Sequence, residues 1–339
     1  MRRRIVMAFM MVCILSFGLL IGCGKETGDS STAKQETDGK YKIVCTLFPQ
    51  YDWVNQIAGE KQDLYDITFL LKDGVDMHNY QPSAMDIAKM GDCDLLIYVG
   101  GESDAWIDEA LKNASNKEMK VVRMMDVLGA RVKEEEIVEG MQEKEHEHDS
   151  DEIADIEYVE VEYDEHVWLS IKNSEIIVER IAESMAELDT ANQSVYDANA
   201  KAYLQQLDTL DAEYQKAVDA SSQKTILYGD RFPFRYLVED YNLTYYAAFA
   251  GCSADVDASF ETITFLAGKL DELSLSSILV LENSDQKVAK TIKDNTSAKN
   301  QAILVMNSLQ SVTQKEADDG YTYIKAMQDN LEVLKQALQ

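Results

Sequence analysis

The chain has 339 residues, enough for about two domains, and its 46% apolar and 27% charged residues exclude wholesale disorder. Acidic residues outnumber basic ones by 61 to 32, which gives a formal net charge of −29. Such an acidic surface repels phosphate backbones, so nucleic acid is excluded as an expected partner. The same charge suits a protein that collects cations.

The N-terminus predicts an exported and anchored protein. Residues 1–22 begin with three arginines and continue as an apolar run from Ile5 to Ile21, as in a secretory signal peptide. Cys23 follows at the expected cleavage point, which resembles a bacterial lipoprotein box, where the cysteine is lipidated. Residues 23–40 then form a polar tether to the cell membrane. The alternative is an uncleaved transmembrane anchor, for which this run is at the short limit.

Short apolar runs alternate with amphipathic segments along the rest of the chain, which predicts an α/β fold of two similar lobes with parallel sheets flanked by helices. The predicted strands are 42–48, 66–71, 94–100 and 121–125 in the first lobe, and 225–229, 244–249, 277–281 and 301–306 in the second. The predicted helices are 52–59, 83–90, 106–113, 234–241, 260–273, 286–295 and 321–338.

Two helical segments are predicted to join the lobes. The first, 174–188, is broken near Asp189, and the second runs from Ala191 to Ala220 without glycine or proline. Thirty helical residues span about 45 Å, so this segment predicts a long, rigid strut that limits closure of the lobes. The predicted organisation is an N-terminal lobe at 41–172, linking helices at 173–222 with the strut at 191–220, and a C-terminal lobe at 223–339.

An acidic segment interrupts the first lobe. Residues 131–165 contain 16 acidic residues, three basic ones and two histidines, His146 and His148. Such a composition is typical of a solvated loop. Because imidazoles beside carboxylates bind divalent metal, the loop is also interpreted as a weak capture arm for cations.

Four potential metal ligands lie where predicted strands or loops end. They are His78, His166, Asp230 and Asp285. Ligands bind at the carboxyl ends of parallel strands, so two imidazoles and two carboxylates, one pair from each lobe, are expected to meet in the cleft between the lobes. Each has an ordinary alternative, because a lone histidine often has no role and an aspartate at a strand end is commonly a helix N-cap.

The chain resembles the metal-binding lipoproteins that serve zinc and manganese ABC importers. The resemblance covers the whole mature chain and rests on several short motifs: His78-x-Tyr80-x-Pro82-Ser83, His166-Val167-Trp168-Leu169, Phe234-Arg235-Tyr236-Leu237, Tyr241-Asn242-Leu243, and Tyr321, Met327, Asn330 and Leu331 of the last helix. It implies one metal in the cleft, and delivery to a permease with its ATPase by a monomeric binding protein.

The third ligand departs from the family pattern. Zinc members carry a histidine at the end of the first strand of the second lobe, and manganese members carry a carboxylate there. Counting from the strand places Asp230 at this position, whereas counting back from the Phe234 motif places Arg231 there. Arginine does not deprotonate, so Asp230 is favoured, and Asp285 matches the family's last-strand carboxylate one residue early. Cys252 is a further candidate if its loop reaches the cleft.

Several functions remain open at this point. Two histidines and two aspartates nominally suit manganese or iron, but zinc members carry an acidic, histidine-bearing loop before the second histidine, so zinc is favoured. A surface adhesin shares the anchor and the fold. A zinc hydrolase is a weaker alternative, with Glu165 or Glu282 as its base, because the chain has no HExxH motif and no nucleophile elbow. The chain is therefore not expected to be an enzyme.

Overall fold

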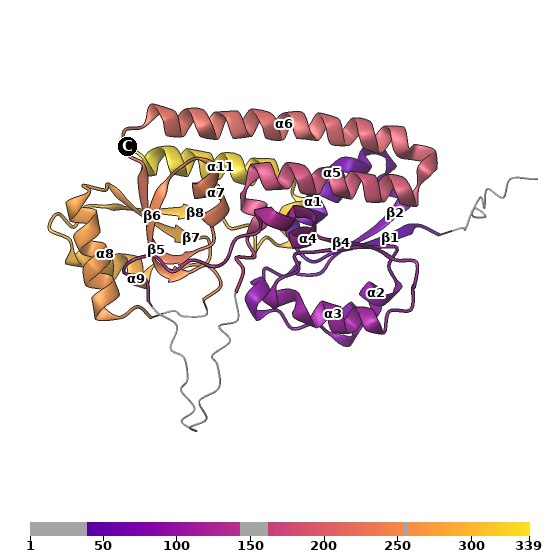
Figure 1. The fold of residues 1–339 in the computed structure, drawn as a ribbon, viewed down its shortest axis with the longest axis horizontal. Coiled ribbons are helices and arrows are strands. Elements are labelled where there is room, and N and C mark those ends of the chain that lie inside the picture. The colour runs from indigo at the N-terminus through magenta and orange to yellow at the C-terminus, as the bar shows by residue number, and fades with distance from the viewer. Residues whose placement is uncertain (1–38, 143–161, 254–256) are drawn as a thin grey trace, which may run out of the picture. The chain divides into compact units, whose positions relative to one another are not determined.

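The computed structural model describes residues 39–142, 162–253 and 257–339. Each lobe contains a sheet of four parallel strands with helices on both faces (Figure 1). The first sheet has the order β2-β1-β3-β4, and its strands are β1 (Tyr41–Cys45), β2 (Tyr65–Phe69), β3 (Leu95–Tyr98) and β4 (Lys120–Arg123). Its helices are α1 (Phe48–Ala58), α2 (Ala84–Asp92), α3 (Ala105–Lys112) and α4 (Met124–Leu128).

The second sheet repeats this arrangement with the order β6-β5-β7-β8. Its strands are β5 (Thr225–Phe232), β6 (Thr244–Ala250), β7 (Ser277–Leu281) and β8 (Ala302–Met306). Its helices are α7 (Arg235–Asp240), α8 (Phe260–Glu272), α9 (Lys287–Asn295), α10 (Gln314–Asp318) and α11 (Tyr323–Ala337). The similar two-lobed α/β build predicted from the sequence is confirmed.

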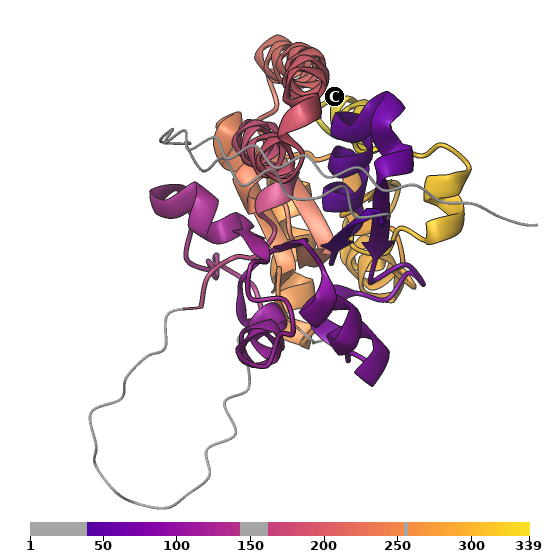
Figure 2. The ribbon, with the colours of Figure 1, turned by 90° about the vertical axis from the view of Figure 1, so that its right-hand side faces the viewer.

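Two long helices join the lobes. Helix α5 covers Ile171–Leu188, a 3₁₀ turn follows at Thr190–Asn192, and α6 covers the 28 residues Gln193–Ala220, or about 42 Å. Figure 1 shows α6 passing over both lobes, and Figure 2 looks along the two helices. The Asn199 amide of α6 donates to the Ile57 carbonyl of α1, and the Tyr214 hydroxyl donates to the Met327 carbonyl of α11. The linking helix therefore contacts both lobes.

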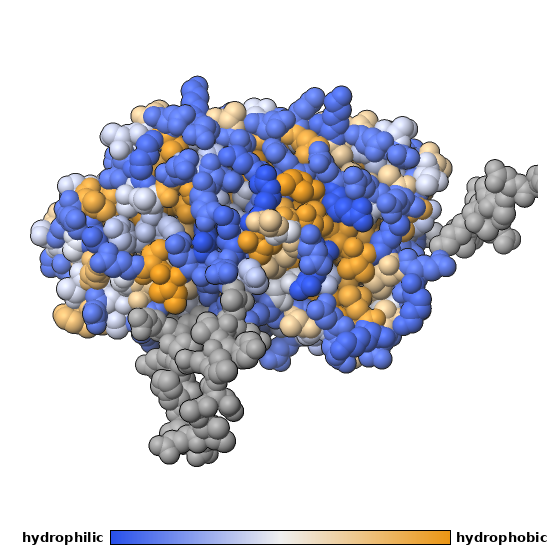
Figure 3. Space-filling model, in the orientation of Figure 1, coloured by the Kyte–Doolittle hydropathy of each residue, from blue (hydrophilic) through white to orange (hydrophobic). Residues whose placement is uncertain are grey.

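The lobes and the linking helices share one hydrophobic core. A single cluster of buried residues includes members of β1, α5, α6, β5 and α11, and a smaller cluster lies around α8 and α9. The face of the molecule in Figure 3 is mostly hydrophilic, with smaller hydrophobic patches, as the acidic composition requires. In the part of the chain that the structure describes, we find no helix with the length and apolar character that a bilayer crossing needs.

Strand β5 differs from the prediction in a way that affects the site. It extends to Phe232, three residues beyond the predicted end, and its pairing with β6 shifts register between Tyr228 and Arg231. Asp230 therefore lies within an irregular strand, and the prediction that it ends the strand is wrong. The short helices α4 and α10 were not predicted, and the boundaries assigned to the lobes and the tether stay predictions.

Candidate metal centre

Three side chains from separate segments form the candidate centre. His78 lies in a 3₁₀ turn, Met77–Asn79, in the loop that follows β2, and the Asp76 carboxylate caps this turn by accepting a hydrogen bond from the His78 backbone N–H at 3.0 Å. His166 is fully buried and immediately precedes a second 3₁₀ turn, Val167–Leu169. Cys252 lies in the turn that follows β6.

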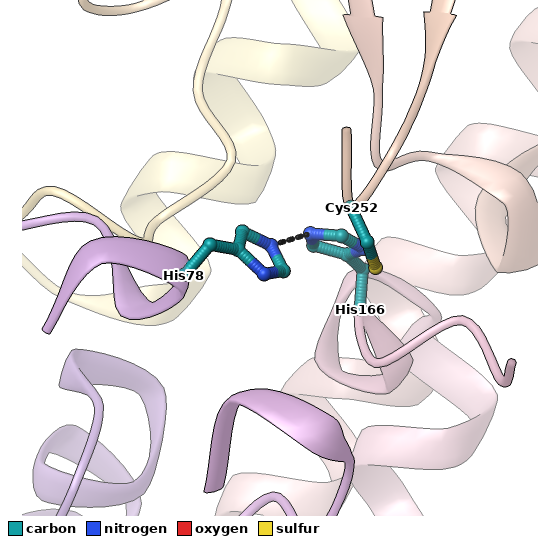
Figure 4. Close-up of side chains that lie close together, drawn as sticks. All are labelled: His78, His166 and Cys252. Atoms are coloured by element: carbon teal, nitrogen blue, oxygen red, sulfur yellow. Dashed lines mark hydrogen bonds between the residues drawn. The ribbon is translucent and has the colours of Figure 1, made fainter. Parts of the chain in front are cut away.

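The ligand atoms of these residues converge. His78 Nε2 lies 3.3 Å from His166 Nε2, and one atom each of His78, His166 and Cys252 lie within 4.8 Å of one another (Figure 4). Zinc binds imidazole nitrogen at about 2.0–2.1 Å, so two nitrogens of a tetrahedral zinc site lie about 3.3 Å apart. The spacing of the two imidazoles therefore matches one edge of such a site.

Hydrogen bonds to the other ring nitrogens orient both imidazoles. The Asp164 carboxylate accepts from His166 Nδ1 at 3.0 Å and also from the His166 backbone N–H at 2.9 Å. A carboxylate only accepts, so the His166 proton is on Nδ1 and its Nε2 lone pair faces His78. His78 Nδ1 contacts the Ser103 hydroxyl at 2.8 Å. Partners of this kind fix the orientation and tautomer of metal-binding histidines.

Burial keeps the side chains of His78 and Cys252 uncharged in the metal-free protein. Desolvation, and then the neighbouring His166, lower the pKa of His78 to about 3, so this ring is neutral at physiological pH. Burial also raises the pKa of the Cys252 thiol, and the nearby carboxylates of Asp164 and Glu135 raise it further. Cys252 is therefore a thiol in the metal-free protein, and metal binding must displace its proton.

Gly251 allows the β6 turn to approach His166. A Cβ atom on this glycine would lie 3.2 Å from the His166 ring and 2.9 Å from the Phe232 carbonyl oxygen. A larger residue here would push Cys252 away from the histidines. Close packing against His166 and Phe232 therefore explains the glycine at position 251.

The structure does not bring Asp230 and Asp285 to the histidines. Asp230 uses one carboxylate oxygen to accept from the Arg231 backbone N–H at 2.8 Å and the other to accept from the Leu281 backbone N–H at 3.3 Å. The bulge in β5 turns Asp230 toward β7 in this way. Asp285 accepts from the Lys287 backbone N–H at 2.8 Å, in an exposed position before α9. Both aspartates line a neighbouring cavity of about 470 Å³.

Arg231, the alternative to Asp230 for the third ligand position, lies next to the candidate centre. Its guanidinium forms an ion pair with Asp76 at 2.6 Å, so a strand of the C-terminal lobe is tied to the turn that carries His78. Arg231 lines both the larger cavity and a cavity of about 190 Å³ that contains His78 and Cys252.

The sequence predicted the two histidines of this cluster but not the residues that hydrogen-bond to them. Asp164 stands two residues before His166, a spacing that signals a local capping bond, whereas Ser103 is distant in the sequence and only the fold reveals its contact. Cys252 was an open alternative, and the structure places it with the histidines. His146, His148 and Cys23 lie outside the described residues.

Comparison with known proteins identifies the family of the chain. The family model described as "Zinc-uptake complex component A periplasmic", ZnuA, matches residues 43–337. The chain belongs to the ZnuA family. The resemblance predicted from the motifs is thereby confirmed, and the periplasmic description of ZnuA agrees with an extracytoplasmic location.

Two curated relatives of the ZnuA family show how much of the protein is shared. The zinc-binding lipoprotein AdcA of Streptococcus pneumoniae (strain ATCC BAA-255 / R6) is 30% identical over 304 residues, which are 89% of this chain and 57% of AdcA. The high-affinity zinc uptake system protein ZnuA of Bacillus subtilis (strain 168) is 28% identical over 322 residues, 95% of this chain and 94% of that protein. The chain thus spans little more than half the length of AdcA.

Solved structures of ZnuA-type proteins have the same fold. The zinc-bound ZnuA-like domain of Streptococcus pneumoniae AdcA matches with a TM-score of 0.66 at 27% identity and covers 88% of this chain and 99% of the domain. The metal-dependent lipoprotein YcdH of Bacillus subtilis matches with a TM-score of 0.68 at 26% identity, covering 88% and 100%.

Proposed function

We propose that this chain captures zinc outside the cytoplasm and delivers it to an ABC permease and its ATPase. The observation that carries the proposal is the convergence of two oriented imidazoles and a thiol within 4.8 Å. The ZnuA family match and the zinc named for AdcA and ZnuA support the same cargo. In this proposal His78, His166 and Cys252 are zinc ligands, and Asp230 and Asp285 are not.

The donor set supports zinc over manganese. Imidazole and thiolate ligands suit zinc, whereas manganese prefers oxygen ligands. The set of two histidines and two aspartates expected from the sequence is harder and closer to a manganese site. Replacing the aspartates with Cys252 in the assignment therefore removes the chemical argument for manganese. A hydrolase is not proposed, because the matching family is one of uptake components.

Cys23 is proposed as the lipid anchor, with residues 24–40 as the tether to the folded lobes. The basic and apolar segment before Cys23 supports this, as does the lipoprotein name of AdcA. Two or three acyl chains, at about 0.8 kcal/mol for each buried CH₂ group, hold a protein at a membrane durably. The binding protein is proposed to act as a monomer.

Metal analysis of the purified protein without residues 1–22 tests the assignment. We expect one zinc per chain and a preference for zinc in competition with manganese. His78→Ala, His166→Ala and Cys252→Ser should each weaken zinc binding by more than about 100-fold, since even a second-shell partner contributes 10–100-fold.

Asp285→Asn provides the matched control, because it removes a charge near the cleft without touching the three ligands. It should leave zinc affinity within about twofold of the wild type. Unchanged stoichiometry and affinity in both histidine variants would show that the centre lies elsewhere. Strong loss in Asp285→Asn or Asp230→Ala would restore the aspartate site and the manganese alternative.

A further inference from the structure

The proposed centre lacks one ligand. Zinc in a closed protein site has four ligands in tetrahedral geometry, and His78, His166 and Cys252 provide three. The carboxylate of Asp230 is held by two backbone N–H groups, and Asp285 lies exposed before α9. The fourth ligand must therefore come from another residue of the cavity or from water.

Glu165 has a carboxylate oxygen with no partner at this place. Its side chain is only 2% exposed, and it lines the same cavity as His78 and Cys252. Oε1 accepts a hydrogen bond from the Ser103 backbone N–H at 2.8 Å. Oε2 has no hydrogen-bond partner among the described residues and lies 3.8 Å from His78 Nδ1, too far for a hydrogen bond.

A buried carboxylate oxygen without a partner is costly and needs a reason. Leaving a buried polar atom unpaired costs about 1–3 kcal/mol, and more for a charged group. Such atoms in native proteins mark a strained or reactive site, a bound water or a bound ion. Here Glu165 lines a cavity together with His78 and Cys252, two of the three proposed zinc ligands, so a cation is the partner that fits the surroundings.

The backbone opposite Glu165 is shaped to admit its side chain. A Cβ atom on Gly101 would lie 2.1 Å from Glu165 Oε1 and 2.4 Å from its Cγ. Gly101 has ordinary extended dihedral angles, with φ of −93°, so backbone strain does not explain the glycine. Close packing explains the glycine, because any larger residue displaces the Glu165 carboxylate from the cavity.

The charge of the coordination sphere favours an anion beyond Cys252, since the buried Asp164 carboxylate at His166 Nδ1 lies outside that sphere. Zinc bound by two neutral imidazoles and one thiolate retains one positive charge, and burying an unbalanced charge is unfavourable. Asp76 is already paired with Arg231, so that pair adds no net charge. One further carboxylate ligand makes the zinc and its ligands neutral.

We propose that Glu165 is the fourth zinc ligand and binds through Oε2. This rests on the proposed function, because it assumes that zinc binds at His78, His166 and Cys252. Glu165 is not among the residues whose ligand atoms lie within 4.8 Å of one another, so its carboxylate must shift toward the zinc on binding, and the orphaned oxygen then becomes a ligand. With four protein ligands, tetrahedral zinc has no coordination position left for water.

Glu165→Gln tests the proposal, because glutamine keeps the volume and the acceptor for Ser103 but loses the charge. Zinc affinity should fall by about 10-fold or more. The thermal midpoint of the metal-free variant should stay the same or rise, because an unpaired buried charge has been removed. A structural role for Glu165 predicts the opposite, a lower midpoint without metal. Glu109→Gln, an exposed site on α3, controls for loss of one negative charge.

Cobalt(II) in place of zinc reports the coordination directly. The wild type should show the intense visible bands of four-coordinate cobalt and a sulfur-to-cobalt charge-transfer band. Glu165→Gln should change the visible bands and keep the charge-transfer band, which Cys252→Ser should abolish. Wild-type affinity and an unchanged visible spectrum in Glu165→Gln would overturn the proposal in favour of water. Failure of the wild type to bind zinc or cobalt would overturn the proposed function itself.

A substitution at Gly101 tests the role of the Glu165 carboxylate without changing Glu165 itself. Gly101→Ala displaces Glu165 without changing it, so zinc affinity should fall as in Glu165→Gln. The double variant should be no weaker than the more affected single variant, because both changes remove one contact. Additive losses would show that the two residues act separately and would count against the assignment.

Discussion

Arg231 places a fixed positive charge beside a proposed cation site, and the Asp76 carboxylate compensates this charge by forming an ion pair with it. Burial opposes ionisation of Asp76, but the adjacent guanidinium outweighs it and holds the pKa of the carboxyl below its usual value. The same carboxylate accepts from the backbone N–H of His78. The ion pair therefore joins β5 to the His78 turn, and Arg231 acts as a positioning residue for the first histidine.

Removing either member of this pair should speed zinc release. We expect Arg231→Gln and Asp76→Asn each to raise the dissociation rate by about 10-fold, as loss of a second-shell partner does. The double variant should release zinc no faster than the more affected single variant. Stopped-flow chelation of the zinc-loaded protein measures all three rates.

Simple electrostatics predicts a different sign for one of these variants. If Arg231 acted only by repelling zinc, Arg231→Gln would slow release while Asp76→Asn would speed it. That pattern would remove the positioning role. Lys287→Gln, which alters an exposed cation of the neighbouring cavity, serves as the control and should leave the rate unchanged.

At the residue scale, the sequence predicted the parts of the site that depend on local order. His78 and His166 could be assigned because each lies in a short motif, and the structure brings them to 3.3 Å. Asp230 was predicted beside the histidines, whereas a bulge that the run of residue types does not reveal directs its carboxylate toward Leu281. The orphaned oxygen of Glu165 depends on the packing of Gly101 and Ser103, which no sequence pattern shows.

At the scale of elements, the contact between α5 and α6 brings three carboxyl groups close together, and their like charges repel one another. Glu175 of α5 has a buried oxygen without a hydrogen-bond partner among the described residues. Burial, and then the negative charges of Asp208 and Asp211 on α6, raise its pKa to about 7. The folded protein therefore holds this proton more tightly than the unfolded chain does.

The sign of the pH dependence follows from this raised pKa. A carboxyl group with a higher pKa in the folded state stabilises the protein as the pH falls from about 7 toward the unfolded value near 4.3. Glu175→Gln should therefore raise the thermal midpoint at pH 8, and the gain should disappear near pH 5. Thermal melts of the metal-free protein at both pH values measure it.

Glu183→Gln on the exposed face of α5 gives the comparison. Its carboxylate pairs with Arg180 at the surface, so the substitution should change the midpoint little at either pH. An equal gain for Glu175→Gln at pH 5 and pH 8 would contradict the proposed titration.

Most elements could be predicted because their burial follows simple rules. The strand β7 was predicted with its observed bounds, since a fully buried parallel strand is a continuous apolar run. The helix predicted at 83–90 is α2, and the side chain of Ser83 caps it by accepting from the Asp86 backbone N–H. The five-residue helices α4 and α10 were missed because segments so short have no detectable period.

At the scale of the whole molecule, residues 143–161 should act on the rate of capture. They contain nine acidic residues against one lysine, together with His146 and His148, and lie outside the described residues. Such a charge attracts cations over a distance of about 30 Å at 0.01 M salt but only about 8 Å at 0.15 M. Replacing them with a Gly-Ser linker of equal length should slow zinc association at low salt and leave the equilibrium affinity within about twofold.

Zinc association rates of the wild type and the linker variant, measured over a range of salt concentrations, test this electrostatic role. The difference in association rate should shrink as the ionic strength rises, because screening removes the long-range attraction. His146→Ala/His148→Ala, made in the otherwise intact loop, separates the imidazoles from the carboxylates. A large loss of equilibrium affinity in either variant would place a loop histidine among the zinc ligands.

The repeated strand order of the two sheets has a consequence for how such proteins diversify. β2 and β6 occupy equivalent outer positions, and the loops that follow them carry His78 and Cys252. An outer strand pairs on one side only, so a change in its loop leaves the other three strands undisturbed. Under the proposed zinc assignment, a point substitution in one of these loops can therefore change a donor atom, and with it the preferred metal, while both sheets keep their strand pairing.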